Sequence, residues 1–326
     1  MRVTLKDIAN LVHVDIGTVS HVINGHPKAA KLRPETRERI MKAVRETGYT
    51  KNKLALAIKS GHSRIMALVS NNIGDDEFMG RIMSGLLEVL AANNYSLRVF
   101  SLRHDNHAEI VQEICAQRIE AVFFHAPGHE YFEDIQLEMQ KNHLPCATID
   151  ISNRIYGFGV VSEDQPIMEE LISYALDRGF VNFCGPMSID SSWEFICRRS
   201  SGFISGIKRF ADRIRKVWDL RDVDFASLPE NTAIICTSDH QALKILEEAH
   251  WKRESFPSVY GISGFGDGLL AGGGMLPLTS INQNHQEMGK MAAAALVRQL
   301  ADGDEKHFSS VQNETIKGRI IPRRSM

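Results

Sequence analysis

The chain has 326 residues, of which 43% are hydrophobic, and its formal net charge at pH 7 is −2. This length and composition indicate a globular protein with a small domain and one large or two-lobed domain. Apolar runs such as 65–70 and 288–296 are far shorter than the roughly 18 residues that cross a bilayer, which excludes a membrane-spanning helix.

The N-terminal residues and the cysteines indicate a cytoplasmic protein. Arg2, Lys6 and Asp7 are not accompanied by the apolar core of a secretory signal. The cysteines are odd in number, widely spaced and without a CxxC pattern, so we expect reduced core thiols at Cys115, Cys146, Cys184, Cys197 and Cys236. We expect no metal site and no cofactor.

Positive charge is concentrated at one end of the chain. Residues 1–64 hold thirteen Lys and Arg against five Asp and Glu, a charge of +8, which leaves −10 for the remainder. Such a basic terminal segment predicts contact with nucleic-acid phosphates. A merely solvated basic domain is the alternative that charge alone leaves open.

Two short helices are predicted within residues 4–24. Thr4 and Asp7 form a capping box in front of an apolar helical pattern, and Asp15 is placed to cap a second helix. Val14 and Val19 make a hydrophobic staple, with Val19 turned inward. The outward residues near the start of the second helix are then Ile16, Gly17, Ser20 and His21. A third helix starts at Pro34 and ends at Gly48.

The residues themselves are more specific than this pattern. Their order and spacing resemble the headpiece of LacI/GalR transcriptional regulators, and the resemblance rests on Thr4-Leu5-Lys6-Asp7-Ile8-Ala9, Val14, Thr18-Val19-Ser20-His21-Val22-Ile23-Asn24, Glu35-Thr36-Arg37 and Gly48-Tyr49. It implies a helix-turn-helix that reads a roughly palindromic DNA operator as a homodimer. Residues 26–31 are longer than the common pattern, and we expect a basic loop there that contacts phosphate.

The resemblance implies that Ile16, Gly17 and His21 select the bases. Ile16 offers only an apolar contact and Gly17 has no side chain, so His21 must supply most of the hydrogen-bond readout. A phosphate contact by His21 is the alternative. The other DNA-contacting residues implied in this segment are Thr4, Thr18, Ser20, Asn24, Lys28 and Lys31.

Residues 52–61 resemble the hinge helix of the same family. A helix this short is marginal in water and is expected to fold when paired with its dimer mate on DNA. Leu54 and Ile58 are expected to contact DNA, with Ile58 as the apolar wedge in the minor groove. Because helix register near a hinge is uncertain, Leu54 and Leu56 are the competing wedges.

Beyond residue 62, strands alternate with amphipathic helices. Strands are predicted at 65–70, 96–100, 121–125, 146–150, 181–184, 233–236 and 258–262, and helices at 79–93, 108–117, 131–142, 165–177, 199–213 and 240–251. This alternation indicates two lobes with doubly wound parallel sheets and a ligand cleft between them.

The same order resembles the periplasmic-binding-protein-like core of the family. The resemblance rests on Phe78 with Gly85, Asp150, Asp164, the run 199–203, Thr232-Ala233 with Ser238-Asp239, Gly264-Phe265, 277–279 and 320–325. It implies a sugar-like effector bound by residues of the cleft, which are Phe78, Trp193, Arg199, Ser238, Asp239 and Asp267. Trp193 is expected to stack on the ligand, a buried loop anchor being the alternative.

The sequence departs from the family at this ligand site. Gly266 stands where a ligand-gripping aspartate is usual, and Asp267 follows one place later, where its side chain takes another direction. Few residues separate Trp218 from Thr232, and Gly272-Gly273-Gly274 adds a flexible stretch near the cleft. The pocket is therefore expected to be remodelled or partly lost.

Taken together, we expect a small all-α headpiece at 1–51, a hinge helix at 52–61 and an α/β sensor domain at 62–326. Lobe 1 is expected at about 62–161 and 290–320, and lobe 2 at about 162–289 and 321–326. The predicted function is a DNA-binding transcriptional repressor modulated by a small molecule. The alternative is a constitutive regulator whose sensor domain only dimerises. An enzyme is disfavoured because the sequence has no HExxH, GxSxG or GxxxxGK(S/T) motif, and because Ser238-Asp239-His240 lies at a predicted strand-to-helix turn, where Ser or Asp is more often a cap. A solute-binding protein would need an export signal.

Overall fold

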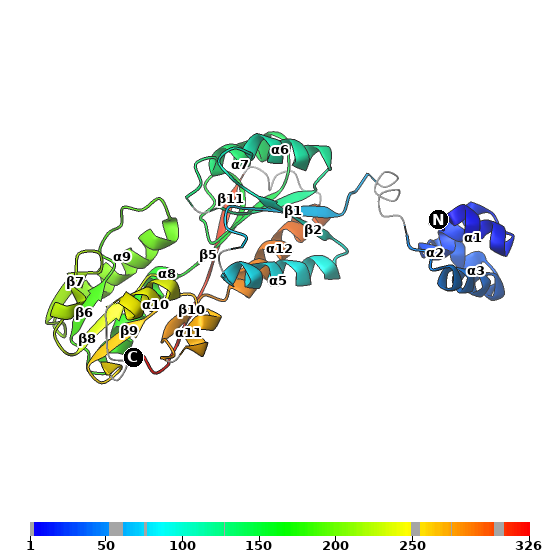
Figure 1. Cartoon of the computed structure of the whole chain (residues 1–326). Coiled ribbons are helices and arrows are strands. Elements are labelled where there is room, and N and C mark those ends of the chain that lie inside the picture. Colours follow the sequence, from blue (N-terminus) through cyan, green and yellow to red (C-terminus); the bar gives the residue numbers. More distant parts are fainter. Residues whose placement is uncertain are drawn as a thin grey trace. The chain divides into compact units, whose positions relative to one another are not determined.

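The computed structural model describes residues 3–51, 61–74, 77–126, 128–248, 255–274, 276–302 and 310–326. It divides into two units, Met1–Ser63 and Arg64–Met326, which are treated separately below (Figure 1). The predicted hinge contacts at Leu54 and Ile58, and the competing Leu56, lie outside the described residues. Within the described residues, no helix is long and apolar enough to cross a membrane.

The N-terminal unit is a cluster of short helices. It contains α1 (Leu5–Val12), α2 (Ile16–Ile23), the 3-10 helix η1 (Pro27–Lys31) and α3 (Pro34–Thr47). The capping box at the start of α1 is confirmed, with the Asp7 amide donating to Thr4 Oγ1 at 3.3 Å and the Thr4 amide donating to Asp7 Oδ2 at 2.8 Å. Gly48 ends α3 in the left-handed region at φ 64°. Residues 27–31 are thus a helical turn, where the sequence predicted a loop.

Apolar residues from α1, α2 and α3 form the core of this unit. Its buried members are Ile8, Ala9, Val12, Val19, Ile40 and Ala43. The predicted staple residue Val14 packs against them, half-buried. Arg39 also ties α3 to α1, because its Nη2 donates to the Val12 carbonyl at 3.1 Å.

Lobe 1 of the second unit is built on a six-stranded parallel sheet. The strand order is β11-β5-β4-β3-β1-β2. The strands are β1 (Ile65–Ser70), β2 (Ser96–Ser101), β3 (Ala121–His125), β4 (Cys146–Ile149), β5 (Gly157–Ser162) and β11 (Val311–Ile316). Its helices are α5 (Glu77–Ala92), α6 (His107–Ala116), α7 (Phe132–Lys141) and α12 (His285–Asp302).

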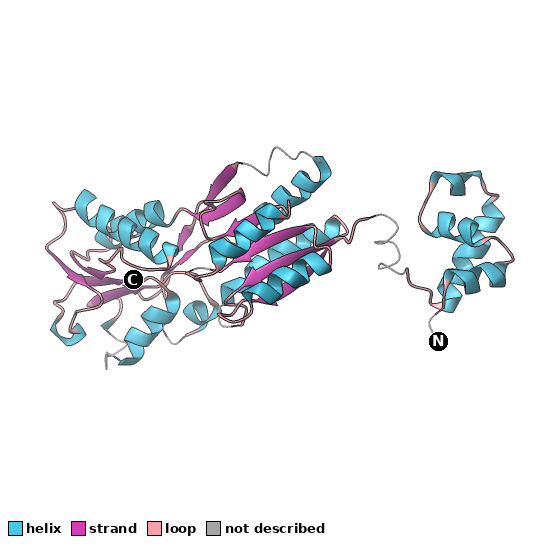
Figure 2. Ribbon diagram, turned by 90° about the horizontal axis from the view of Figure 1, so that it is seen from above, coloured by secondary structure: helices cyan, strands magenta, loops and turns pink. Residues whose placement is uncertain are grey.

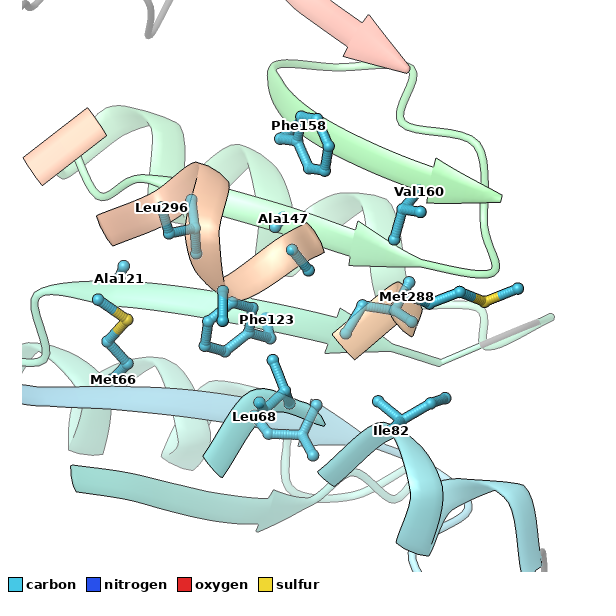
Figure 3. Packing of buried hydrophobic residues seen from close by; sticks show 14 of the residues in the cluster. Met66, Leu68, Ile82, Ala121, Phe123, Ala147, Phe158, Val160, Met288 and Leu296 are labelled. Atoms are coloured by element: carbon cyan, nitrogen blue, oxygen red, sulfur yellow. The ribbon is translucent and has the colours of Figure 1, made fainter. Parts of the chain in front are cut away.

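Alternate residues of the strands point to opposite faces, so each face of the sheet has its own core. Met66, Leu68 and Phe123 pack with α5 and α12, as the side chains in Figure 3 show. Ala67, Val69, Val122 and Phe124 pack instead with α6 and α7. Helices therefore cover both faces, as predicted for a doubly wound sheet (Figure 2).

Lobe 2 contains a four-stranded parallel sheet in the order β7-β6-β8-β9 and a two-stranded antiparallel sheet, β10-β12. The strands are β6 (Asn182–Gly185), β7 (Lys216–Asp219), β8 (Thr232–Ile235), β9 (Tyr260–Ser263), β10 (Ser280–Asn282) and β12 (Arg319–Ile321). The helices are α8 (Asp164–Leu176), α9 (Glu194–Arg209), η2 (Phe225–Ser227), α10 (Asp239–Glu248) and α11 (Leu269–Gly273).

The structure corrects several predictions in this unit. Helix α9 begins at Glu194, before the predicted 199, and Gly272 and Gly273 belong to α11 instead of a flexible stretch. The segment 285–289 was assigned to lobe 2, but it begins α12, which packs on α5 in lobe 1. Residues 319–320 were assigned to lobe 1, but they belong to β12, which pairs with β10. Among the cysteines, Cys115 is exposed and Cys197 half-buried, while the other three are buried.

Candidate functional site

The accessible face of α2 holds the residues predicted to read DNA. Ile16 is 43% exposed, Gly17, Thr18, Ser20 and His21 are half-buried, and Val19 is fully buried on the opposite face. Asp15 caps the helix by accepting from the Gly17 amide at 2.6 Å. The start of α2 is therefore fixed, and its outward face presents one apolar side chain and two hydroxyls beside the His21 imidazole.

Other predicted DNA contacts lie at the ends of α1, α2 and η1. Thr4 and Asn24 are exposed, and the Asn24 amide donates to Ser20 Oγ at 3.2 Å. Lys28 and Lys31 are exposed on η1. Lysines in this position can contact phosphates without reading bases.

A cavity of about 580 Å³ lies between the two lobes of the second unit. Phe78, His125, Asp150 and His285 line it from lobe 1, and Arg199, Thr237, Asp239 and Phe265 are among those that line it from lobe 2. This volume fits a small organic ligand. Of the six predicted effector residues, five line the cavity: Phe78, Trp193, Arg199, Ser238 and Asp239.

Arg199 is held rigidly in the wall of this cavity. Its Nε donates to Asp164 Oδ2 at 3.2 Å, and its Nη1 donates to the Thr237 carbonyl at 2.7 Å. The guanidinium also lies 3.9 Å from the ring centroid of Phe265 and 4.6 Å from that of Phe195. Two of the Arg199 nitrogens that were expected to bind a ligand therefore donate instead to Asp164 and to the Thr237 carbonyl.

A partly buried charge network is centred on Arg198, the neighbour of Arg199 in the sequence. Arg198 Nη2 donates to Asp150 Oδ1 at 2.7 Å, and Arg198 Nη1 donates to Glu194 Oε1 at 3.0 Å. Burial opposes ionisation of Asp150, but Arg198 and Arg199 outweigh it and hold the pKa of Asp150 below its ordinary value. Asp150 therefore offers a charged carboxylate at the edge of the cavity.

Two histidines that sequence reasoning missed complete the lobe 1 wall. His125 and His285 are both buried, and Phe78 stacks on His285 with ring centroids 5.0 Å apart and meets the edge of His125 at 5.5 Å. Burial lowers the pKa of both imidazoles, that of His285 to about 3. They are neutral at pH 7 and can recognise a ligand through hydrogen bonds.

The remaining predicted effector residues serve the structure in different ways. Ser238 Oγ accepts from the Gln241 amide at 3.0 Å and caps α10, as expected for a residue at a helix start. Asp239 accepts from the Gly268 amide at 2.8 Å and from Ser280 Oγ at 2.6 Å, and burial raises its pKa. Trp193 is 41% exposed, so it is not a buried loop anchor.

Asp267 is the exception, because it does not line this cavity. Its backbone is left-handed, at φ 56°, and follows Gly266 at φ 124°. Its carboxylate forms an ion pair with Arg323 and accepts from Asn282 Nδ2 at 2.8 Å. In this structure the Asp267 carboxylate therefore anchors the C-terminal segment and does not line the cavity in which the sequence placed it.

Several cavity residues that were not predicted lie at or just after the end of a strand. His125 ends β3, Thr237 follows β8, Phe265 follows β9, and Gln283 and His285 follow β10. In open α/β sheets, ligands bind beyond the carboxyl ends of the strands, so this position was the available signal. Among the described residues, no group of three or more His, Cys, Asp or Glu side chains could hold a metal ion.

Two family models match the chain. The model for bacterial regulatory proteins of the lacI family matches residues 4–52, and that for the periplasmic binding protein-like domain matches residues 170–326. Among curated relatives, the ribose operon repressor of Haemophilus influenzae is 23% identical over 96% of each chain. The transcriptional repressor CytR of Escherichia coli is 26% identical over 91% of this chain and 89% of its own.

Solved structures share the same architecture. The lac repressor dimer bound to operator and an anti-inducer has a TM-score of 0.78 at 18% identity, covering 100% of this chain and 99% of the other. The CelR–cellobiose complex has a TM-score of 0.65 at 18% identity and covers 100% of both chains. At this identity the likeness establishes the fold, with a helix-turn-helix headpiece and a periplasmic-binding-protein-like domain.

Proposed function

We propose that the chain is a transcriptional repressor of the lacI type that binds a palindromic operator as a homodimer, and the match of residues 4–52 to the lacI family model supports this proposal. The observation that carries the proposal is the outward face of α2, where Ile16 is exposed and His21 is half-buried, together with the exposed lysines of η1. Bases would be read by the former, and phosphates bound by the latter. Such a protein acts in the cytoplasm, where its DNA lies.

The proposed regulator responds to a small molecule in the cavity between the lobes. Aromatic rings of Phe78, Phe195 and Phe265 supply flat apolar surface, while Asp150 and the two neutral histidines supply polar contacts. This mixture suits a sugar-like ring with one apolar face and several hydroxyls. We assign no catalytic role to Ser238, because its hydroxyl caps α10.

Two observations favour the alternative of a constitutive regulator. Asp267 is turned away from the cavity, and two donors of Arg199 are used within the protein. Both features reduce the grip available for a sugar. The two candidates share the DNA-binding role and differ in whether any ligand stabilises the second unit.

Selection from a randomised DNA library with the full chain tests the shared role. We expect enrichment of one sequence with two-fold symmetry, because two identical headpieces present the same residues to each half-site. Residues 64–326, which form the second unit, are the matched control and should enrich nothing. Equal enrichment by the control would overturn the assignment of DNA binding to the headpiece.

A further inference from the structure

The C-terminal end of α2 brings two histidines together. The helix is followed by Asn24 and by Gly25, whose φ of 65° is left-handed. The His26 amide donates to the His21 carbonyl at 2.9 Å, and the Gly25 amide donates to the Val22 carbonyl at 3.3 Å. This pair of hydrogen bonds is a Schellman motif, which folds the residue after the glycine back toward the last turn of the helix.

An apolar contact usually accompanies this motif, and here a ring contact takes its place. The imidazoles of His21 and His26 are stacked, with centroids 4.6 Å apart and an interplanar angle of 30°. His21 is half-buried, while His26 is exposed. The ring of His26 therefore covers one face of the residue to which the base readout was assigned.

The ring of His26 is also held at its edge by a hydrogen bond. Its Nδ1 accepts from the Lys28 amide at 3.2 Å, which caps the first turn of η1. Pro27 follows at the first position of that turn and has a fixed φ. His26 is thus joined to α2 through its amide and to η1 through its ring, so its imidazole has little freedom to rotate.

We propose that His26 is a positioning residue for DNA readout: its stacked ring holds the His21 imidazole in one orientation for a base edge. This inference rests on the proposed function, since it needs α2 to enter the major groove. A side chain ordered before binding loses less conformational entropy on binding, and its hydrogen bond is aimed at one base pattern. The turn η1 then contributes to specificity as well as to phosphate binding.

Two substitutions separate the ring of His26 from its capping nitrogen. His26→Asn keeps a side-chain acceptor for the Lys28 amide but removes the ring. His26→Phe keeps a flat ring against His21 but removes the acceptor. His21→Ala identifies the base position that His21 reads, and Lys28→Ala removes a nearby charge without altering either ring.

The experiment compares the base preferences that these full-length variants select from a randomised duplex library. We expect His26→Asn to lower discrimination at the His21 position by roughly ten-fold, and His26→Phe to retain most of it. Lys28→Ala should weaken binding to all sequences about equally and leave that discrimination unchanged. A purely structural role for His26 would not change preference at a single symmetric pair of positions.

Three results would overturn the proposal. His26→Asn could select the same bases as the unaltered chain, His26→Phe could lose as much discrimination as His26→Asn, or His21→Ala could change no position. The unaltered chain distinguishes these failures from failure of the proposed function. If it enriches no sequence at all, the DNA-binding role is wrong and the positioning role is overturned with it.

Discussion

At the scale of single residues, Phe78 offers the most direct test of the proposed ligand binding, because its ring lines the cavity between the lobes. It stacks on His285, meets His125 and faces the space between the lobes. A ligand that binds the folded chain raises its melting temperature by mass action, by about 5 °C or more at 100 times Kd. We expect such a rise for one member of a panel of sugars, polyols and purines, and we expect Phe78→Ala to abolish it.

Phe210→Ala is the control for this experiment, because Phe210 is also half-buried but packs at the end of α9, away from the cavity residues. Both variants should melt lower than the unaltered chain, since each loses apolar contacts. Only Phe78→Ala should lose the response to ligand. A panel without any stabilising compound would favour the constitutive regulator.

Also for single residues, the sequence predicted several side chains of the site, but it did not predict the contacts that each of them makes. Phe78 and Arg199 were placed by resemblance, and both line the cavity. Asp267 was misplaced because its direction depends on two consecutive positive φ angles and on Arg323, which lies 56 positions away. His125 stands at the end of a predicted strand, but its burial and its contact with Phe78 depend on elements that are distant in the sequence.

At the scale of elements, the packing of α5 against α12 offers a sharp test. A Cβ at Gly85 would lie 2.0 Å from the Gln286 carbonyl oxygen, and one at Gly289 would lie 2.2 Å from that of Ile82. The two backbones approach closely only because both positions are glycine. Gly85→Ala must push the helices apart, and we expect it to lower the free energy of unfolding by roughly 2–3 kcal/mol.

Gly80→Ala is the matched control on the same helix. Gly80 is exposed, and a Cβ there would meet nothing within 4 Å. This variant should be unchanged or more stable by roughly 0.5–1 kcal/mol, because alanine favours the helix. Denaturant unfolding of both variants makes the comparison. Equal stability of Gly85→Ala and Gly80→Ala would contradict the close approach of α5 and α12.

Elements were predictable where their signals are local. The capping box of α1, Pro34 at the start of α3 and Gly48 at its end each act within a few residues. The strand β11 was not predicted: its partner β5 lies about 150 positions earlier, and it is exposed over five of its six residues. Such a strand has no alternating apolar pattern that a sequence can display.

For the molecule as a whole, charge and fold indicate that the two units have different roles. The basic headpiece carries the proposed DNA contacts, and the acidic second unit carries the cavity. The sequence predicted this division because charge is a property of composition. It did not predict the full lining of the cavity, including His125 and His285, because the chain passes between lobe 1 and lobe 2 three times, near residues 163, 284 and 317.

An equilibrium titration of the full chain with its selected DNA tests the central claim most directly. The measurement compares that DNA with a scrambled duplex of the same length at rising salt. The account predicts at least about 10³-fold tighter binding of the selected DNA. Affinity for both duplexes should fall steeply with salt, because the counterions that binding releases gain less entropy at higher salt concentration. Equal affinity for the two duplexes, or affinity independent of salt, would contradict the assignment of this chain as a sequence-specific DNA-binding regulator.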